Sequence, residues 1–196
     1  MSLHIQNLSV GTLRDVHLKV GSGQVFCVSG PSGSGKSRLL RAIADLEPHA
    51  GRVTLNGEDR EALAAHAWRA RVMLVPAESQ WWADRVGEHF ARPMGEELAA
   101  LGFPEDAPGW AVSRLSSGEK QRLALLRALS RDPTALLLDE PTANLDDSST
   151  RRVEEWLLGE IAERGLAVLW VAHDAAQIRR VARRHWRIEG AELVNV

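Results

Sequence analysis

The segment best suited to chemistry is glycine-rich and reads GPSGSGKS from Gly30 to Ser37, which matches the pattern G-x-x-x-x-G-K-[ST]. In such a loop the backbone N–H groups surround phosphates at the start of a helix. Lys36 is expected to reach the β- and γ-phosphates, and the Ser37 hydroxyl to bind Mg²⁺. The loop predicts a triphosphate site formed by Gly30, Pro31, Ser32, Gly33, Ser34, Gly35, Lys36 and Ser37.

Two carboxylates form the second candidate group. Asp139 and Glu140 follow the apolar segment Ala135 to Leu138, which is typical of a buried strand. In a parallel sheet ligands bind at the carboxyl ends of the strands, so this pair is expected beside the phosphate loop. Asp139 would hold Mg²⁺, and Glu140 would polarise the attacking water as a general base.

A third motif identifies a family. Leu115 to Glu119 reads LSSGE, and a helical pattern follows it up to Ser130. With this motif in place, the chain resembles the ATP-binding cassette (ABC) family of ATPases, whose signature is LSGGQ. Pro141 to Asp146 is similar to the D-loop of that family, and Val171 to Asp174 to its switch-histidine loop. The motifs stand in the family's order and cover nearly the whole chain.

The resemblance implies ATP and Mg²⁺ as cofactors and a head-to-tail homodimer with two ATP molecules at its interface. The signature of one subunit would meet the γ-phosphate bound by the other. His173 would contact that phosphate and Glu140, holding the water in line. Residues added to the nucleotide site by the resemblance are Ser116, Ser117, Gly118, Glu119 and Asp146.

The pattern of the chain predicts an α/β fold, namely a P-loop NTPase core with a mainly parallel sheet. Two alternating segments, Leu3 to Val10 and Val16 to Val20, predict an antiparallel β subdomain near the N-terminus. Residues from about 77 to 130 show little strand pattern and predict a short helical insertion. We expect one domain over 1–196, with a core of 1–76 and 131–196 and a helical subdomain of about 77–130.

Further elements follow from the periodicity of apolar residues. Strands are expected at residues 25–28, 52–55, 72–75, 135–138 and 167–171. Helices are expected at residues 36–44, 61–70, 150–164 and 175–182.

Two departures from the family concern the nucleotide. ABC ATPases commonly stack adenine on an aromatic side chain in the early strands, but this chain has no tyrosine and reads SVGTL from Ser9 to Leu13. We expect weaker or less base-selective binding, because base–aromatic stacking is worth about 1–3 kcal/mol. Arg38 stands where a threonine often follows the phosphate loop, and it either adds a cation near the phosphates or faces solvent.

A third departure concerns the Q-loop, whose glutamine position falls at Ala77 in register with the family. Gln80 lies three residues late, while Glu78 is nearer. Either Gln80 reaches Mg²⁺ and the water, acting as a catalytic residue and metal ligand, or Glu78 substitutes for it. The adjacent Trp81 and Trp82 cannot both face one core, so at least one is expected on a surface that contacts a membrane permease. The alternative is that both pack inside the helical insertion.

Composition narrows the function. A net charge of −2 from 24 basic and 26 acidic residues disfavours a nucleic-acid partner. The single cysteine, Cys27, excludes an internal disulfide and is expected in the core. No long apolar run and no signal peptide are evident, so we expect a cytoplasmic protein held at the inner or plasma membrane by its permease.

The leading hypothesis is an ATP-hydrolysing transporter subunit that drives a separately encoded permease. The later segments of the chain look most like those of small bacterial ATPases that belong to metal exporters of the iron type. One alternative is a soluble regulatory nucleotide-binding module with weak hydrolysis, although Glu140 and His173 argue against it. A DNA-acting ATPase of this family is disfavoured because Lys36 and Gly118 are only 82 positions apart, which leaves no room for a coiled-coil arm.

Overall fold

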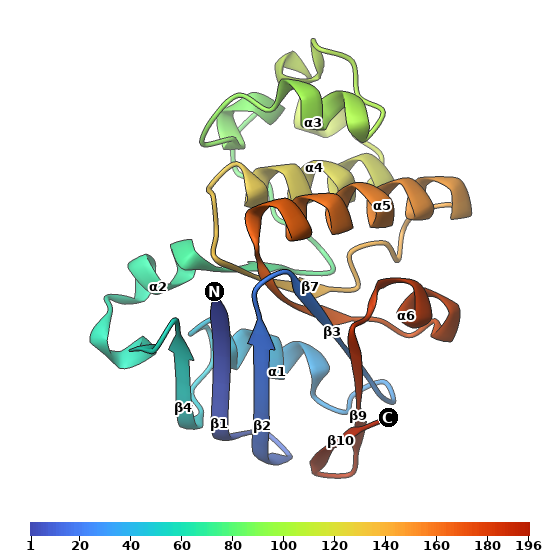
Figure 1. Ribbon diagram of the computed structural model, residues 1–196. Coiled ribbons are helices and arrows are strands. Elements are labelled where there is room, and N and C mark those ends of the chain that lie inside the picture. The colour runs from blue at the N-terminus through green and yellow to red at the C-terminus, as the bar shows by residue number, and fades with distance from the viewer.

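Two β-sheets organise the chain, and the computed structural model describes all 196 residues (Figure 1). The larger sheet has the strand order β10-β9-β3-β8-β7-β6, and all of its pairings are parallel except that of β9 with β10. Its strands are β3 (Gln24–Ser29), β6 (Val72–Val75), β7 (Ala135–Asp139), β8 (Ala167–Val171), β9 (Arg184–Glu189) and β10 (Glu192–Asn195).

The smaller sheet is antiparallel, with the order β2-β1-β4-β5. It contains β1 (Ser2–Val10), β2 (Leu13–Gly21), β4 (Ala50–Leu55) and β5 (Glu58–Asp59). The predicted α/β class, the mainly parallel sheet and the antiparallel N-terminal unit are therefore confirmed.

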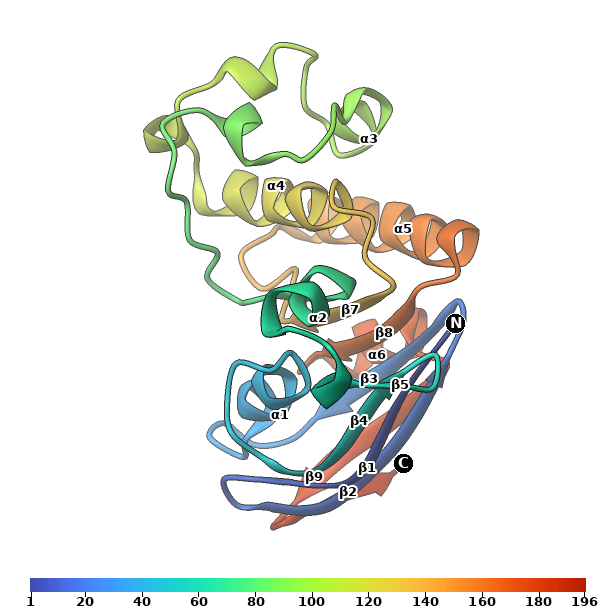
Figure 2. The ribbon, with the colours of Figure 1, turned by 90° about the vertical axis from the view of Figure 1, so that its left-hand side faces the viewer.

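The helices cover both faces of the larger sheet. Figure 2 shows α4 and α5 together on one side of β7 and β8, with α3 beyond them and α1 on the other side. The helix α1 packs against β1 of the small sheet as well as against β6, β7 and β8. The six helices are α1 (Lys36–Ile43), α2 (Ala65–Arg71), α3 (Gly95–Ala100), α4 (Ser117–Leu129), α5 (Asp147–Arg164) and α6 (Ala175–Val181).

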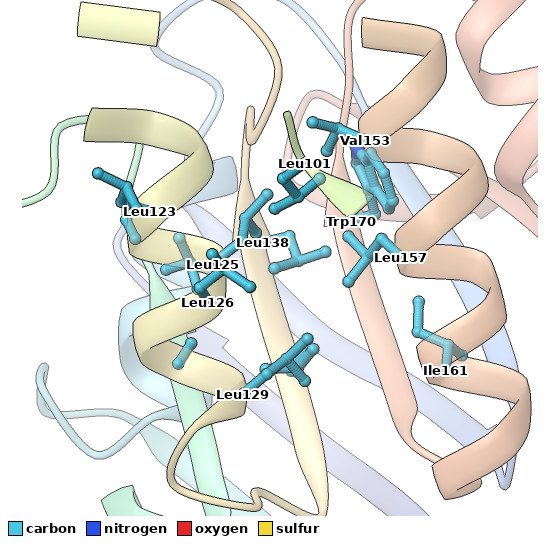
Figure 3. Packing of buried hydrophobic residues seen from close by; sticks show 14 of the residues in the cluster. Leu101, Leu123, Leu125, Leu126, Leu129, Leu138, Val153, Leu157, Ile161 and Trp170 are labelled. Carbon is cyan, nitrogen blue, oxygen red and sulfur yellow. The ribbon is translucent and has the colours of Figure 1, made fainter. Parts of the chain in front are cut away.

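The central strands are buried on both faces, which explains their continuous apolar sequences. Leu136 and Leu138 of β7 belong to a core cluster with α4 and α5, while Leu137 belongs to a second cluster with α1. In β8, Trp170 joins the first cluster and Leu169 the second. Figure 3 shows Leu138 and Trp170 between the leucines of α4 and Val153, Leu157 and Ile161 of α5.

Cys27 lies in the same core with none of its surface exposed, as predicted, and burial raises the pKa of its thiol to about 12. A thiol with so high a pKa is not a nucleophile at neutral pH.

The structure also differs from the sequence prediction in two places. The helix expected over 61–70 is divided into a single 3-10 turn, Arg60–Ala62, and the helix α2. The hairpin of β9 and β10 was not predicted, because Ile188 is its one fully buried side chain and its remaining residues carry no clear alternation.

Candidate active site

The phosphate loop connects β3 to α1. Gly30, Gly33 and Gly35 have backbone φ angles of 146°, 76° and 102°, which residues other than glycine rarely adopt. Gly35 directly precedes α1, so the loop ends at the N-terminus of that helix. The free N–H groups of the first turn therefore face the space that the loop encloses.

Lys36 closes over this loop. Its Nζ donates hydrogen bonds of 2.9 Å to the carbonyl oxygens of Gly30 and Pro31. Burial lowers the pKa of Lys36, although the nearby charges of Glu140 and Asp139 oppose the shift. The ammonium group thus shares one neighbourhood with the loop and with both carboxylates.

Asp139 ends β7, which is separated from β3 by β8 alone. Its side chain is buried, and burial raises the pKa of this carboxyl, while a hydrogen bond with the Ser37 hydroxyl opposes the shift. A carboxylate whose charge is disfavoured by burial gains from a nearby cation. One carboxylate and one hydroxyl are oxygen donors that suit Mg²⁺, which keeps several waters and takes phosphate oxygens as further ligands.

Glu140 follows in an uncommon backbone conformation. Its φ is 49°, in the left-handed region, and its N–H donates to the Val171 carbonyl at the end of β8 over 3.2 Å. Such a conformation in a residue other than glycine is strained and is frequent at functional sites. It accompanies a hydrogen bond of 2.6 Å between Glu140 Oε1 and Nε2 of His173, which is the second residue after β8.

A buried polar network lies behind this pair. Gln177 of α6 donates hydrogen bonds of 2.8 Å to Thr142 Oγ1 and to the carboxylate of Glu154 in α5. Arg180 binds both oxygens of Glu154 over 2.7 and 2.8 Å. The network ties the start of the D-loop to both helices, and it was not predicted, because its members are brought together only by the packing of α5 and α6.

An open hollow of about 400 Å³ adjoins the pair. Glu140 and His173 line it together with residues of the D-loop and of the first turns of α5 and α6. The side chains of Glu140 and His173 are 33% and 48% exposed, so a water molecule or a ligand has access to both.

The signature begins α4. Ser116 accepts a hydrogen bond from the Glu119 N–H over 3.2 Å, and the Glu119 carboxylate accepts one from the Ser116 N–H over 2.8 Å. This capping box explains the acid at the last signature position, because glutamate and glutamine can both return such a bond. The bond from the Ser116 N–H is the largest cause that lowers the pKa of Glu119.

Gly118 is pressed against the D-loop. A Cβ at this position would lie 3.2 Å from the Asn144 carbonyl oxygen and 3.1 Å from Leu145 Cδ2. The D-loop ends at Asp146, whose carboxylate accepts hydrogen bonds from the N–H groups of Ser148 and Ser149 and caps α5. These and the serine hydroxyls keep the pKa of Asp146 far below its usual range.

The structure separates the signature from the phosphate loop of the same chain. The helices α1 and α4 lie on opposite faces of the sheet (Figure 2). No hydrogen bond or ion pair joins Ser116–Glu119 to Gly30–Ser37. Ser117, the first residue of α4, is exposed. The phosphate loop and the signature therefore lie apart within one chain.

The structure does not join the Q-loop candidates to the carboxylates. Gln80 and Glu78 are both exposed, and neither side chain forms a hydrogen bond with Ser37 or Asp139. The Gln80 carbonyl instead accepts a hydrogen bond of 2.6 Å from Arg127 of α4.

Arg38, expected either near the phosphates or facing solvent, has a side chain that is about half exposed. Its guanidinium pairs with Glu47 over 2.6 Å and forms no hydrogen bond with the phosphate loop.

The two tryptophans are divided as the sequence predicted. Trp82 is 67% exposed, whereas Trp81 packs against the core. Both rings meet His89 edge-on, and the Arg127 guanidinium lies 4.7 and 5.0 Å from their centroids. Trp82 also lines a mainly apolar groove of about 510 Å³ between α2, β6 and α4.

Comparison with known proteins decides the family. A sequence model described as ABC transporter matches residues 13–143, from the start of β2 to the D-loop. The chain belongs to the ABC transporter family. The motifs that carry the resemblance thus stand in a chain whose fold and sequence both agree with that family.

Two relatives of this ABC protein have names that mention iron. It is 40% identical over 187 residues to the Fe(3+) ions import ATP-binding protein FbpC of Streptomyces coelicolor, covering 88% of this chain and 53% of that protein. It is 32% identical to the probable iron export ATP-binding protein FetA of Escherichia coli, covering 85% and 80% of the two chains. The chain therefore spans about half the length of the first relative.

A solved structure has the same fold. A bacterial Atm1-family ABC exporter with ATP bound superposes with a TM-score of 0.85 at 24% identity, over 98% of this chain and 38% of the exporter chain. In this ABC protein, no helix combines the length and the hydrophobicity that crossing a membrane requires.

Proposed function

We propose that this ABC protein binds and hydrolyses ATP and thereby drives transport by a membrane permease on a separate chain. The observation that carries the proposal is the hydrogen bond of 2.6 Å between Glu140 and His173 at the strand ends beside the phosphate loop. A carboxylate held by an imidazole at this edge of the sheet is placed to act on a water molecule next to the γ-phosphate.

Each residue has a definable part in the hydrolysis. The loop N–H groups and Lys36 bind the phosphates and offset their negative charge. Glu140 accepts a proton from the attacking water while the water oxygen bonds to the γ-phosphorus. ADP leaves on the side opposite to the attacking oxygen. His173 donates to the Glu140 carboxylate and orients it.

Ser37 and Asp139 fit the Mg²⁺ that normally accompanies ATP. Their oxygen atoms would hold the ion, which when bound neutralises charge on the β- and γ-phosphates. In the Q-loop, Gln80 would approach the ion and the water, with Glu78 as the alternative.

Hydrolysis would take place in a head-to-tail homodimer. The phosphate loop and the signature lie apart in one chain, so a second copy is needed to bring Ser116 and Gly118 to the γ-phosphate. The N-terminus of α4 would then direct its partial positive charge at that phosphate. The near contact of Gly118 with Asn144 couples the signature of each copy to its own D-loop.

The groove beside Trp82 is the proposed contact with the permease. Its lining includes His66, Arg69, Arg127 and Arg131 and contains no carboxylate. A short permease segment with apolar and acidic side chains would complement both the apolar surface and the charge. With the proposed division into a core of 1–76 and 131–196 and a helical subdomain of about 77–130, this groove would lie between the two parts.

Among transporters, we place the chain with the small ATPases of bacterial metal exporters. The support is the similarity to the probable iron export ATP-binding protein, with 32% identity over 179 residues.

The test uses Glu140→Gln, which removes the base and keeps the size of the side chain. Static light scattering should show a monomer without nucleotide and a dimer at millimolar ATP. Steady-state hydrolysis should fall at least ~100-fold, as expected for loss of a general base. The matched control is Glu105→Gln, which changes an exposed glutamate between α3 and α4 and should leave ATP hydrolysis normal.

Unchanged hydrolysis in Glu140→Gln would overturn the assigned role of this carboxylate. ATP-dependent dimers together with negligible turnover in the unmodified chain would favour the regulatory nucleotide-binding module instead.

A further inference from the structure

The strand order sets the direction in which a bound nucleotide must lie. The phosphate loop follows β3, and the carboxylates Asp139 and Glu140 lie to one side of it, beyond β8. On the other side of β3 stands β9. The γ-phosphate end points to the carboxylates, so the ribose and base lie on the opposite side, toward β9.

The wall on that side is the turn between β1 and β2. A Cβ at Gly35 would lie 3.5 Å from Leu13 Cδ1, so the start of β2 touches the phosphate loop. The Arg14 N–H donates to the Ala191 carbonyl over 2.8 Å, which joins the turn to the hairpin of β9 and β10. This rim, defined as residues 11–14 with 190–191, borders the loop where the base would emerge.

Arg38 reaches this rim from the first turn of α1. A Cβ at Gly11 would lie only 2.6 Å from Arg38 Nη1 and 2.9 Å from its Cζ. The guanidinium therefore fills the space that a side chain at residue 11 would occupy. Because a helical side chain leans toward the N-terminus of its helix, residue 38 can extend back beside the phosphate loop.

Glu47 holds the guanidinium in place. The carboxylate lies 2.6 Å from Arg38 and 3.7 Å from Arg41, and it is only 18% exposed. The Arg38 side chain itself is 55% exposed, so the group is fixed by its partner and open to the solvent. No aromatic residue occurs between Ser9 and Arg14, so the planar groups at this turn are two guanidinium groups. That of Arg14 donates to the Gly11 and Leu13 carbonyl oxygens over 2.7 and 2.8 Å, and that of Arg38 is the one held by a carboxylate.

We propose that the Arg38 guanidinium stacks on the base of the bound nucleotide and replaces the aromatic side chain that this chain lacks. A guanidinium is flat, permanently charged and weakly hydrated, and it stacks well on aromatic faces. Stacking reads the face of a base and not its hydrogen-bonding edge, so ATP and GTP should bind within about threefold of each other. This inference rests on the proposed nucleotide-binding function and names its base-contacting residue.

The test compares a ligand with a base and one without. Isothermal titration calorimetry measures the binding of ATP and of inorganic tripolyphosphate to the unmodified chain and to Arg38→Ala, Arg38→Lys and Arg38→Trp. Arg38→Ala and Arg38→Lys should bind ATP about tenfold more weakly, with tripolyphosphate within about twofold of normal. Arg38→Trp restores a planar surface and should keep ATP binding within about threefold.

The matched control is Arg41→Ala, since Arg41 lies on the same helix, pairs with the same Glu47 and is 53% exposed. It should leave both affinities unchanged. The melting temperature of each variant, measured in parallel, confirms that the folds are intact.

Other outcomes overturn the inference in separable ways. Equal weakening of ATP and tripolyphosphate in Arg38→Ala would make Arg38 a phosphate contact. Full ATP affinity in Arg38→Lys would show that a positive charge suffices without a planar guanidinium. Full ATP affinity in Arg38→Ala would show that residue 38 does not contact the base. Failure of the unmodified chain to bind either ligand would instead overturn the proposed function, and this inference with it.

Discussion

Different kinds of structure hold the proposed catalytic residues and the residues proposed to contact a permease. Glu140 and His173 follow β7 and β8, whose residues are all buried. Gln80 and Trp82 lie in a stretch after β6 that contains no regular element until a single turn at Val86–His89. Buried strands hold catalytic atoms within a fraction of an ångström, whereas the irregular stretch depends on a few side-chain contacts.

His89 shows how those few contacts work. Its Nε2 accepts hydrogen bonds of 3.1 Å from the N–H groups of Trp82 and Ala83, and its Nδ1 donates to the Arg85 carbonyl over 3.0 Å. The imidazole is almost fully buried. The His89 side chain thus supplies hydrogen bonds that a neighbouring strand would supply in a sheet.

The largest effect is expected from His173→Ala. Glu140 would lose the partner that orients it, and ATP hydrolysis should fall ~100-fold or more. The melting temperature should change by less than ~2 °C, because the imidazole is about half exposed. Phosphate release and thermal unfolding measure the two quantities. Hydrolysis within threefold of normal would contradict the role given to His173.

The opposite response is expected from His89→Ala. Loss of three hydrogen bonds and of a buried ring should cost about 2 kcal/mol and lower the melting temperature by roughly 6 °C. Hydrolysis at 20 °C should stay within about twofold. The control is His17→Ala, an exposed histidine of β2. A large loss of hydrolysis with unchanged stability would break the distinction between the two regions.

A smaller effect sharpens the comparison from within the catalytic region. Burial raises the pKa of Asp139, so the folded chain holds a proton there more tightly than the unfolded chain does. The stabilisation from that proton is present in acid and is lost as the pH rises through the raised pKa. At neutral pH the ionised, buried carboxylate therefore destabilises the fold.

Asp139→Asn should accordingly raise the melting temperature at pH 7.5 by about 2 °C while Mg²⁺-dependent hydrolysis is lost. The gain should shrink as the pH falls toward the ordinary range of a carboxyl group. Thermal unfolding from pH 5 to pH 8 measures it. A gain that is largest in acid would have the wrong sign and would show that burial of the charge is not its cause.

The contiguous motifs were predictable because neighbouring residues alone determine their local backbone conformation. The phosphate loop needs glycine backbone freedom and the first turn of α1, and both occur within Gly30–Ser37. The carboxylates Asp139 and Glu140 were predictable for the same reason, since a parallel strand ends where its ligand binds. The β9–β10 hairpin gave no such signal, because its buried content is a single isoleucine.

By itself, the amino-acid sequence determined the family and the α/β order of the elements, and it predicted the residues that we propose to bind the phosphates. Only the tertiary structure decided that Arg38 lies against Gly11, that Glu154 joins Thr142 through Gln177, and that Trp82 is exposed while Trp81 is not. The physical reason is range. Backbone conformation and periodicity act over a few neighbouring residues, whereas these contacts depend on how distant helices and turns pack together.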